Sequence, residues 1–159
     1  MLTSAFAGVN PVMAAAPNDP ATIRIPMTVV GFDPEVAAAN GYPAVPPVSA
    51  FSTDVVTGNC GYSSVSLRDV GSKKYTVVTG FGVAPAAVSY TWSVRVTGPK
   101  WDKTHRWSGG LALRTTWQGQ VTNVVNTGGW YVAKATGTAV LSNGFVCSSG
   151  GPVTEEAIY

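Results

Sequence analysis

The sequence predicts an all-β domain built as a sandwich of two sheets, and three observations support this fold class. Apolar and polar side chains alternate without a break over residues 88–97, as in a strand with one face on a core and the other in water. Only 11% of the residues are charged, against about 25% in a typical soluble domain. Finally, Cys60 and Cys147 bracket the region that is richest in strand patterns.

The chain divides into three parts: residues 1–16, 17–57 and 58–159. The first ends in Ala14-Ala15-Ala16, which has the small-x-small form of a signal-peptidase site, although a basic start is missing. We therefore predict a truncated signal peptide here, and an ordinary disordered N-terminus is the alternative. No run of apolar residues in the sequence is long enough for a membrane-spanning helix.

Residues 17–57 form a Pro- and Ala-rich arm with one strand and one helix. Alternating apolar residues predict a strand over 21–30, and Pro26 confines that strand to a sheet edge because proline cannot donate to a ladder. Asp33 can cap a helix, Pro34 suits its first position, and Gly41 suits the left-handed residue that ends it. The arm is thus predicted to hold an edge strand followed by about two helical turns.

The body, residues 58–159, contains seven segments with strand patterns, separated by Gly, Pro and Asn turn signals. These segments are 60–68, 74–83, 87–97, 104–118, 120–126, 130–142 and 145–148. Gly109-Gly110 allows a bulge in the fourth, and a Gly-Pro turn is expected after the last one. Seven strands bracketed by two cysteines predict an immunoglobulin-like sandwich, with Trp92 in its core.

The two cysteines predict a single disulfide. An even cysteine count in a small, weakly charged, β-rich chain is typical of exported proteins. A Cys60–Cys147 bridge would close a long loop, which the chain-entropy model values at on the order of 4 kcal/mol. Two buried free thiols are the alternative. Two Cys and one His cannot supply the four ligands of a structural zinc site.

The net charge of +2 conceals an uneven distribution. Residues 60–147 carry nine basic and two acidic side chains, a net +7, whereas residues 1–59 carry one basic and four acidic, a net −3. Glu155 and Glu156 add −2. Either the acidic flanks pack on the basic body, or the body meets an anionic surface. A pI of about 8.6 and one short basic cluster do not predict nucleic-acid binding.

Several residues suggest catalysis, but none forms a complete set. Ser149-Gly150-Gly151-Pro152 is similar to the nucleophile segment of chymotrypsin-like peptidases, yet the single histidine, His105, is too near in sequence and an orienting acid is missing. Cys60 with His105 could form a nucleophile pair only if Cys60 were not bridged. Asp69 and Asp102, the two acids between Cys60 and Cys147, lie beside turns rather than facing a cleft. We assign no catalytic residue, cofactor or metal.

The segment Gly98-Pro99-Lys100-Trp101-Asp102-Lys103-Thr104-His105-Arg106-Trp107 gathers tryptophans and basic residues between two strong strands. An aromatic platform with cations at a loop tip can stack on a sugar or meet an anionic polymer. The segment also fits a solvated hairpin in which Trp107 turns into the core and the charges protect an edge. The candidate ligand-binding residues are Lys100, Trp101, Lys103, His105 and Arg106.

Three short stretches and one cysteine resemble small secreted actinobacterial proteins of unknown function: residues 31–42, 59–62 and 107–110, with the late Cys147. The resemblance implies export and carries no activity that could be transferred. Together with the motifs above, it predicts a secreted, non-catalytic binding domain for a carbohydrate or an anionic cell-surface polymer. The alternatives are a protein-partner or inhibitor module acting through the arm or a strand edge, and a hydrolase. The oligomeric state is not predicted.

Overall fold

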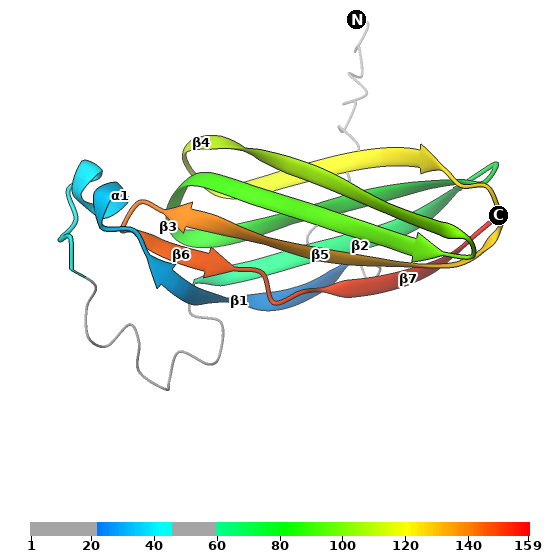
Figure 1. Ribbon diagram of the computed structural model, residues 1–159, viewed down its shortest axis with the longest axis horizontal. Coiled ribbons are helices and arrows are strands. Elements are labelled where there is room, and N and C mark those ends of the chain that lie inside the picture. Colours follow the sequence, from blue (N-terminus) through cyan, green and yellow to red (C-terminus); the bar gives the residue numbers. More distant parts are fainter. Residues whose placement is uncertain (1–21, 46–59) are drawn as a thin grey trace, which may run out of the picture.

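The computed structural model describes residues 22–45 and 60–159, so the predicted signal peptide and the rest of the arm lie outside the described residues. Strands dominate the fold, and one short helix follows the first strand (Figure 1). The elements are β1 (Ile23–Phe32), α1 (Pro34–Ala39), β2 (Gly61–Gly71), β3 (Lys74–Gly98), β4 (Trp101–Val124), β5 (Gly129–Leu141), β6 (Phe145–Ser148) and β7 (Val153–Ile158).

The strands form two layers that share the long hairpin β3–β4. The hydrogen-bonded order is β4-β3-β2-β1-β6-β5-β7, and β3 also pairs with β5. The first part of β3 pairs with β2, and residues 87–97 pair with β5. β4 follows β3 along almost its whole length and pairs with no other described strand, so it is an edge strand of both layers. The predicted all-β sandwich is confirmed (Figure 1).

Two predicted strand breaks lie inside continuous strands. The register of β3 shifts between Gly82 and Ala87, but its pairing with β4 continues on both sides, so 74–83 and 87–97 are one strand. β4 bulges opposite this point, where Ala112 and Leu113 take positive φ angles of 45° and 60°. The predicted break at Gly119 was also wrong. Gly119 sits in register within β4, where a Cβ would meet the rings of two tryptophans.

Within the described residues 22–45, the arm contains the predicted strand and the predicted helix. β1 pairs with β2 up to Met27 and with β6 from Thr28 onward, so it passes from one layer to the other. Pro26 lies in the part that pairs with β2 alone, where a missing N–H can be tolerated. In α1, the Asp33 carboxylate accepts hydrogen bonds from the backbone N–H groups of Glu35 and Val36, at 3.0 and 3.1 Å.

The chain ends in a strand that the sequence pattern did not indicate. β7 pairs with β5, opposite residues 129–134, and β7 also contacts β2. Its inward residue Ile158 is fully buried, while Glu155 is exposed. The immunoglobulin-like strand order is not confirmed, because bent strands serve both layers instead of belonging to separate sheets.

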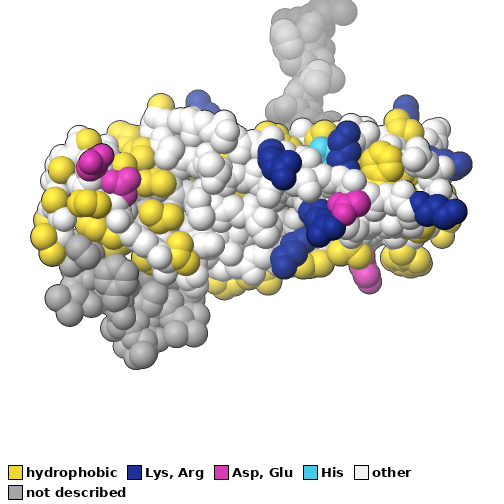
Figure 2. Space-filling model, viewed as in Figure 1, with side chains coloured by type: hydrophobic (Ala, Val, Ile, Leu, Met, Phe, Trp, Pro, Cys, Tyr) yellow, Lys and Arg dark blue, Asp and Glu magenta, His cyan; other side chains and the backbone are white. Residues whose placement is uncertain are grey.

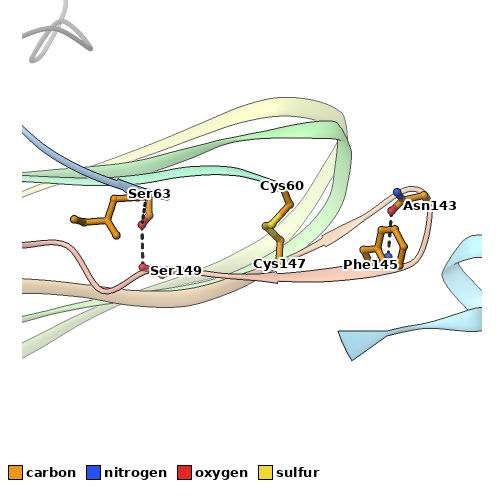
Figure 3. Close-up of a disulfide and its surroundings, with 7 residues drawn as sticks. Cys60, Ser63, Asn143, Phe145, Cys147 and Ser149 are labelled. Carbon is orange, nitrogen blue, oxygen red and sulfur yellow. Dashed lines mark hydrogen bonds between the residues drawn. A yellow bond between two sulfur atoms is a disulfide. The ribbon is translucent and has the colours of Figure 1, made fainter. Parts of the chain in front are cut away.

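The core is aromatic and is bridged by the predicted disulfide. The ring of Trp92 lies 5.2 Å from that of Phe81, and its buried indole N–H donates to Thr79 Oγ1 at 2.9 Å. The disulfide joins Cys60, just before β2, to Cys147 in β6, with 6.3 Å between the Cα atoms (Figure 3). The bridge is thus confirmed, and the described residues contain no free cysteine.

Candidate functional site

The predicted loop of residues 98–107 is the closed end of the β3–β4 hairpin. Gly98 pairs with Trp101, so the turn consists of Pro99 and Lys100 alone. Proline at the first turn position and a positive φ of 53° at Lys100 are typical of a type II turn. Every later residue of the segment belongs to β4. The candidate residues therefore sit mainly on a strand, where side chains alternate between two faces.

This alternation separates the five candidate residues. Trp101, Lys103 and His105 project from the face that meets the core, with Trp101 half-buried, Lys103 exposed at the strand edge, and His105 8% exposed. Arg106 projects from the outer face, and Lys100 lies exposed in the turn. The structure therefore does not bring the five side chains together as one platform.

His105 is buried and hydrogen-bonded inside the fold, and it does not line an exposed binding surface. Its Nε2 atom lies 2.8 Å from Oη of the fully buried Tyr75. Burial lowers the pKa of His105, and the nearby charge of Lys103 lowers that pKa further. The lowered pKa keeps the imidazole neutral at pH 7, and in that form one ring nitrogen can accept a hydrogen bond.

The aromatic side chains of β4 cover the core at the edge of the sandwich that β4 forms. Because β4 ends both layers among the described strands, its inward side chains meet across the gap between them. The rings of Trp107 and Trp117 lie 5.8 Å apart in an edge-to-face arrangement, and the ring of Trp117 lies 4.5 Å from that of Tyr90. We call this set the aromatic seam; it consists of Trp101, His105, Trp107 and Trp117.

The opposite, outer face of β3, β4 and β5 carries cations among hydroxyl groups. Ser93 and Thr136 are hydrogen-bonded across β3 and β5 at 3.0 Å, as are Thr91 and Thr138 at 3.2 Å, which places these side chains on one face. By alternation, three basic residues and one tryptophan share that face. We call this surface the cationic face; its members are Arg95, Arg106, Lys134 and Trp130.

The charges on the cationic face are only partly compensated. Arg95 forms a two-point ion pair with Asp102, with Nε to Oδ1 at 2.9 Å. This pair raises the pKa of Arg95 and lowers that of Asp102. Within residues 22–45 and 60–159, no carboxylate lies within ion-pair distance of Arg106 or Lys134. Lys134 stands directly opposite Arg95, and such like-charged cross-strand pairs are unfavourable for stability.

Trp130 was not among the residues singled out from the sequence. Its side chain is 63% exposed, whereas the next residue, Tyr131, is fully buried. A signal was available, because Trp130 shares its parity with the polar Lys134 and Thr136, while the alternate positions between them are apolar. The sequence pattern did not show on which face the indole lies. In the structure, the odd-numbered residues of β5 point inward, so Trp130 points outward.

Figure 2 shows basic side chains gathered over the half of the molecule that lies away from α1. Between this group and the end with α1, most of the visible surface carries neither a charge nor a hydrophobic side chain. Glu155 of β7 lies at the margin of the cationic face, opposite Val132. The cationic face is formed by paired strands, so it is a sheet surface rather than a cleft.

The residues considered for catalysis are engaged elsewhere. Ser149 Oγ donates to Ser63 Oγ at 3.1 Å (Figure 3) and accepts from the Gly151 N–H at 3.0 Å, while His105 is bonded to Tyr75. Cys60 is bonded to Cys147 in the disulfide.

In the described parts of the chain, no three His, Cys, Asp or Glu residues could jointly hold a metal ion. Among the same residues, no helix is long and apolar enough to cross a membrane.

Comparisons with protein-family models, with curated proteins and with solved structures found no match for this chain.

Proposed function

We propose that this protein is a secreted, non-catalytic domain that binds an anionic polymer on its cationic face. The observation that carries the proposal is the exposure of Arg106 and Lys134 on one face, beside Arg95 and without a carboxylate partner among the described residues. Placing Lys134 directly opposite Arg95 lowers the stability of the folded state. A bound polyanion would offset that cost and make use of the arrangement.

The shape of the face supports a polymer over a small molecule. Small ligands are usually held in concave, mostly apolar pockets. The cationic face is instead formed by three adjacent strands whose residues 93–97, 102–106 and 132–136 are in continuous register. An extended chain can lie across such a surface and meet several cations at once, and the positive field also speeds the encounter.

The disulfide supports secretion. Bridges of this kind persist in oxidising compartments and are rare in the cytosol. Cys60 and Cys147 are both almost fully buried, and the bond between them ties the two layers together. An exported domain with a cationic face would meet cell-surface or environmental polyanions first.

The test compares the polyanion affinities of two double variants, one that removes two positive charges from the cationic face and one that removes two from elsewhere. Arg106→Gln combined with Lys134→Gln should weaken binding to polygalacturonate and to polyphosphate by about tenfold, and should reduce the dependence of affinity on salt. Arg114→Gln combined with Lys74→Gln removes the same charges from exposed positions outside the face and should leave both affinities nearly unchanged. Equal losses in the two double variants, measured by calorimetry, would contradict the proposal.

A protein-partner role through a strand edge is the second candidate, because β4 pairs only with β3 among the described strands. Gly98 and Trp101 close the two-residue turn, so the N–H groups of even-numbered residues 102–108 point away from β3. Thr104→Pro would remove one such donor while sparing the β3–β4 ladder. If this variant no longer binds strand peptides and keeps its polyanion affinity, the result supports this role. If it still binds strand peptides, the result counts against the role.

A further inference from the structure

We infer that the polymer is an acidic polysaccharide, one of whose sugar rings stacks on Trp130. The inference rests on the proposed function for its location and adds the chemical class of the ligand. Of the large hydrophobic side chains in the described residues, Trp130 is among the most exposed, at 63%. It lies on the same face as the cations, at the start of β5.

The position of Trp130 relative to the cations suits an oligomer. Trp130 and Lys134 are four residues apart on one strand, which corresponds to about 13 Å. Arg95 lies directly across from Lys134, and Arg106 is one step further along the sheet, opposite Ser93. A ligand that touches the indole and all three cations must therefore extend diagonally over three strands, well beyond a single sugar ring.

The chemistry of these groups selects the polymer class. A pyranose ring has an apolar C–H face that can cover an indole, hydroxyl groups at its rim, and, in a uronic acid, a carboxylate. The cationic face offers a matching set: the flat ring of Trp130, the hydroxyl groups of Ser93 and Thr136, and the positive charges of Arg106 and Lys134. A neutral glycan would leave the cations unused, and polyphosphate has no apolar face for the indole.

The surroundings of Trp130 are those of a platform rather than of a core residue. Its cross-strand neighbour on β7 is the small Ala157, and its neighbour along the face is Val132. The adjacent Gly129 lies close against Pro99 of the hairpin turn, which supports this end of β5. The indole is held near the surface without being enclosed, so a ligand could cover its open face.

The experiment compares native protein with Trp130→Ala against three probes: an oligogalacturonate, a polyphosphate of similar charge, and neutral dextran. Trp130→Ala should weaken oligogalacturonate binding by about tenfold while leaving polyphosphate binding nearly unchanged. Trp130→Phe should restore most of the lost affinity because it keeps a flat ring. Tyr42→Ala removes another exposed aromatic ring, beyond α1 and off the cationic face, and should change neither affinity.

The outcomes separate the two proposals. Equal oligogalacturonate affinity in native protein and Trp130→Ala, with charge-dependent binding retained, would overturn the sugar inference and leave the polyanion proposal standing. Dextran binding as tight as oligogalacturonate binding would overturn the acidic part of the inference. If the native protein binds neither polyanion, the proposed function itself fails. Selective loss of oligogalacturonate binding in Trp130→Ala supports both.

Discussion

The aromatic seam and the cationic face both contain tryptophan, but their tryptophans lie in opposite environments. Trp107 and Trp117 of the seam pack ring against ring between the two layers. Trp130 of the cationic face stands in solvent on the side of the sheet that carries Lys134. The seam looks more like a binding platform in the sequence, because its tryptophans and the cations are adjacent there. In the fold, strand parity sends the tryptophans inward and Arg106 outward.

The comparison shows that local composition does not identify a platform on a strand. Side chains two apart share a face, and side chains next to each other do not. Trp107 and Arg106 are sequence neighbours that point to different environments. Trp130 and Lys134 are separated by four residues and share one face. A binding surface on strands is therefore defined by the face of the sheet. Four predictions test whether the aromatic seam stabilises the fold while the cationic face binds the polyanion.

The largest expected effect comes from the core beneath the seam. Trp92→Ala would remove a buried indole that contacts Phe81 and Trp117 and donates to Thr79. We expect the free energy of unfolding to fall by about 3–5 kcal/mol, measured by urea denaturation. Trp130→Ala should change it by about 0.5 kcal/mol or less. Similar losses in both variants would erase the distinction between the two regions.

The disulfide supports both regions, because it joins the two layers that carry them. Replacing Cys60 and Cys147 together by Ala should lower the free energy of unfolding by about 2–4 kcal/mol, with little change in polyanion affinity while the protein stays folded. Reduction of the native protein should reproduce the loss. Titration of denatured, non-reduced protein should find no free thiol, and a titre of two would refute the bridge.

The seam should respond to pH, and the cationic face should not. The pKa of His105 lies below the ordinary 6.5 in the folded state, so below pH 6.5 the unfolded chain binds more protons. The contribution of His105 to stability is therefore complete above pH 6.5 and decreases as the pH falls toward the lowered folded pKa. His105→Gln should remove this part of the pH dependence of unfolding. Polyanion binding should change little over this range, because His105 is buried on the inward side of β4 and does not belong to the cationic face.

The smallest effect concerns the Arg95–Asp102 pair, which is largely exposed. Asp102→Asn removes the carboxylate that occupies the Arg95 guanidinium, so polyanion affinity should rise about twofold with stability almost unchanged. Glu35→Gln, on α1 at the other end of the molecule, removes one negative charge as a control. An equal rise in both variants would show that net charge alone, and not the face, sets affinity.

Much of the local structure could be predicted from short-range signals. The alternation of residues 88–97 marked part of β3, and Asp33 with Pro34 marked the start of α1. The bounds predicted for β6, Phe145–Ser148, match those observed. β7 was not predicted, because Pro152 and the two glutamates obscure its alternation and its pairing with β5 is a long-range contact. The prediction of a strand end at Gly119 is wrong, because the neighbouring tryptophan rings and not a turn require the glycine there.

The sequence by itself determined that this chain forms strands, where its helix begins, and that Cys60 and Cys147 can form a bridge. Those features depend on side-chain periodicity, on a capping carboxylate and on cysteine count, all of which are readable without the fold. Only the tertiary structure decided that β3 and β4 bend through both layers and that Trp130, rather than Trp101, is exposed. The face on which a strand residue lies depends on register with distant partners, and a shift of one residue exchanges every inward side chain for an outward one.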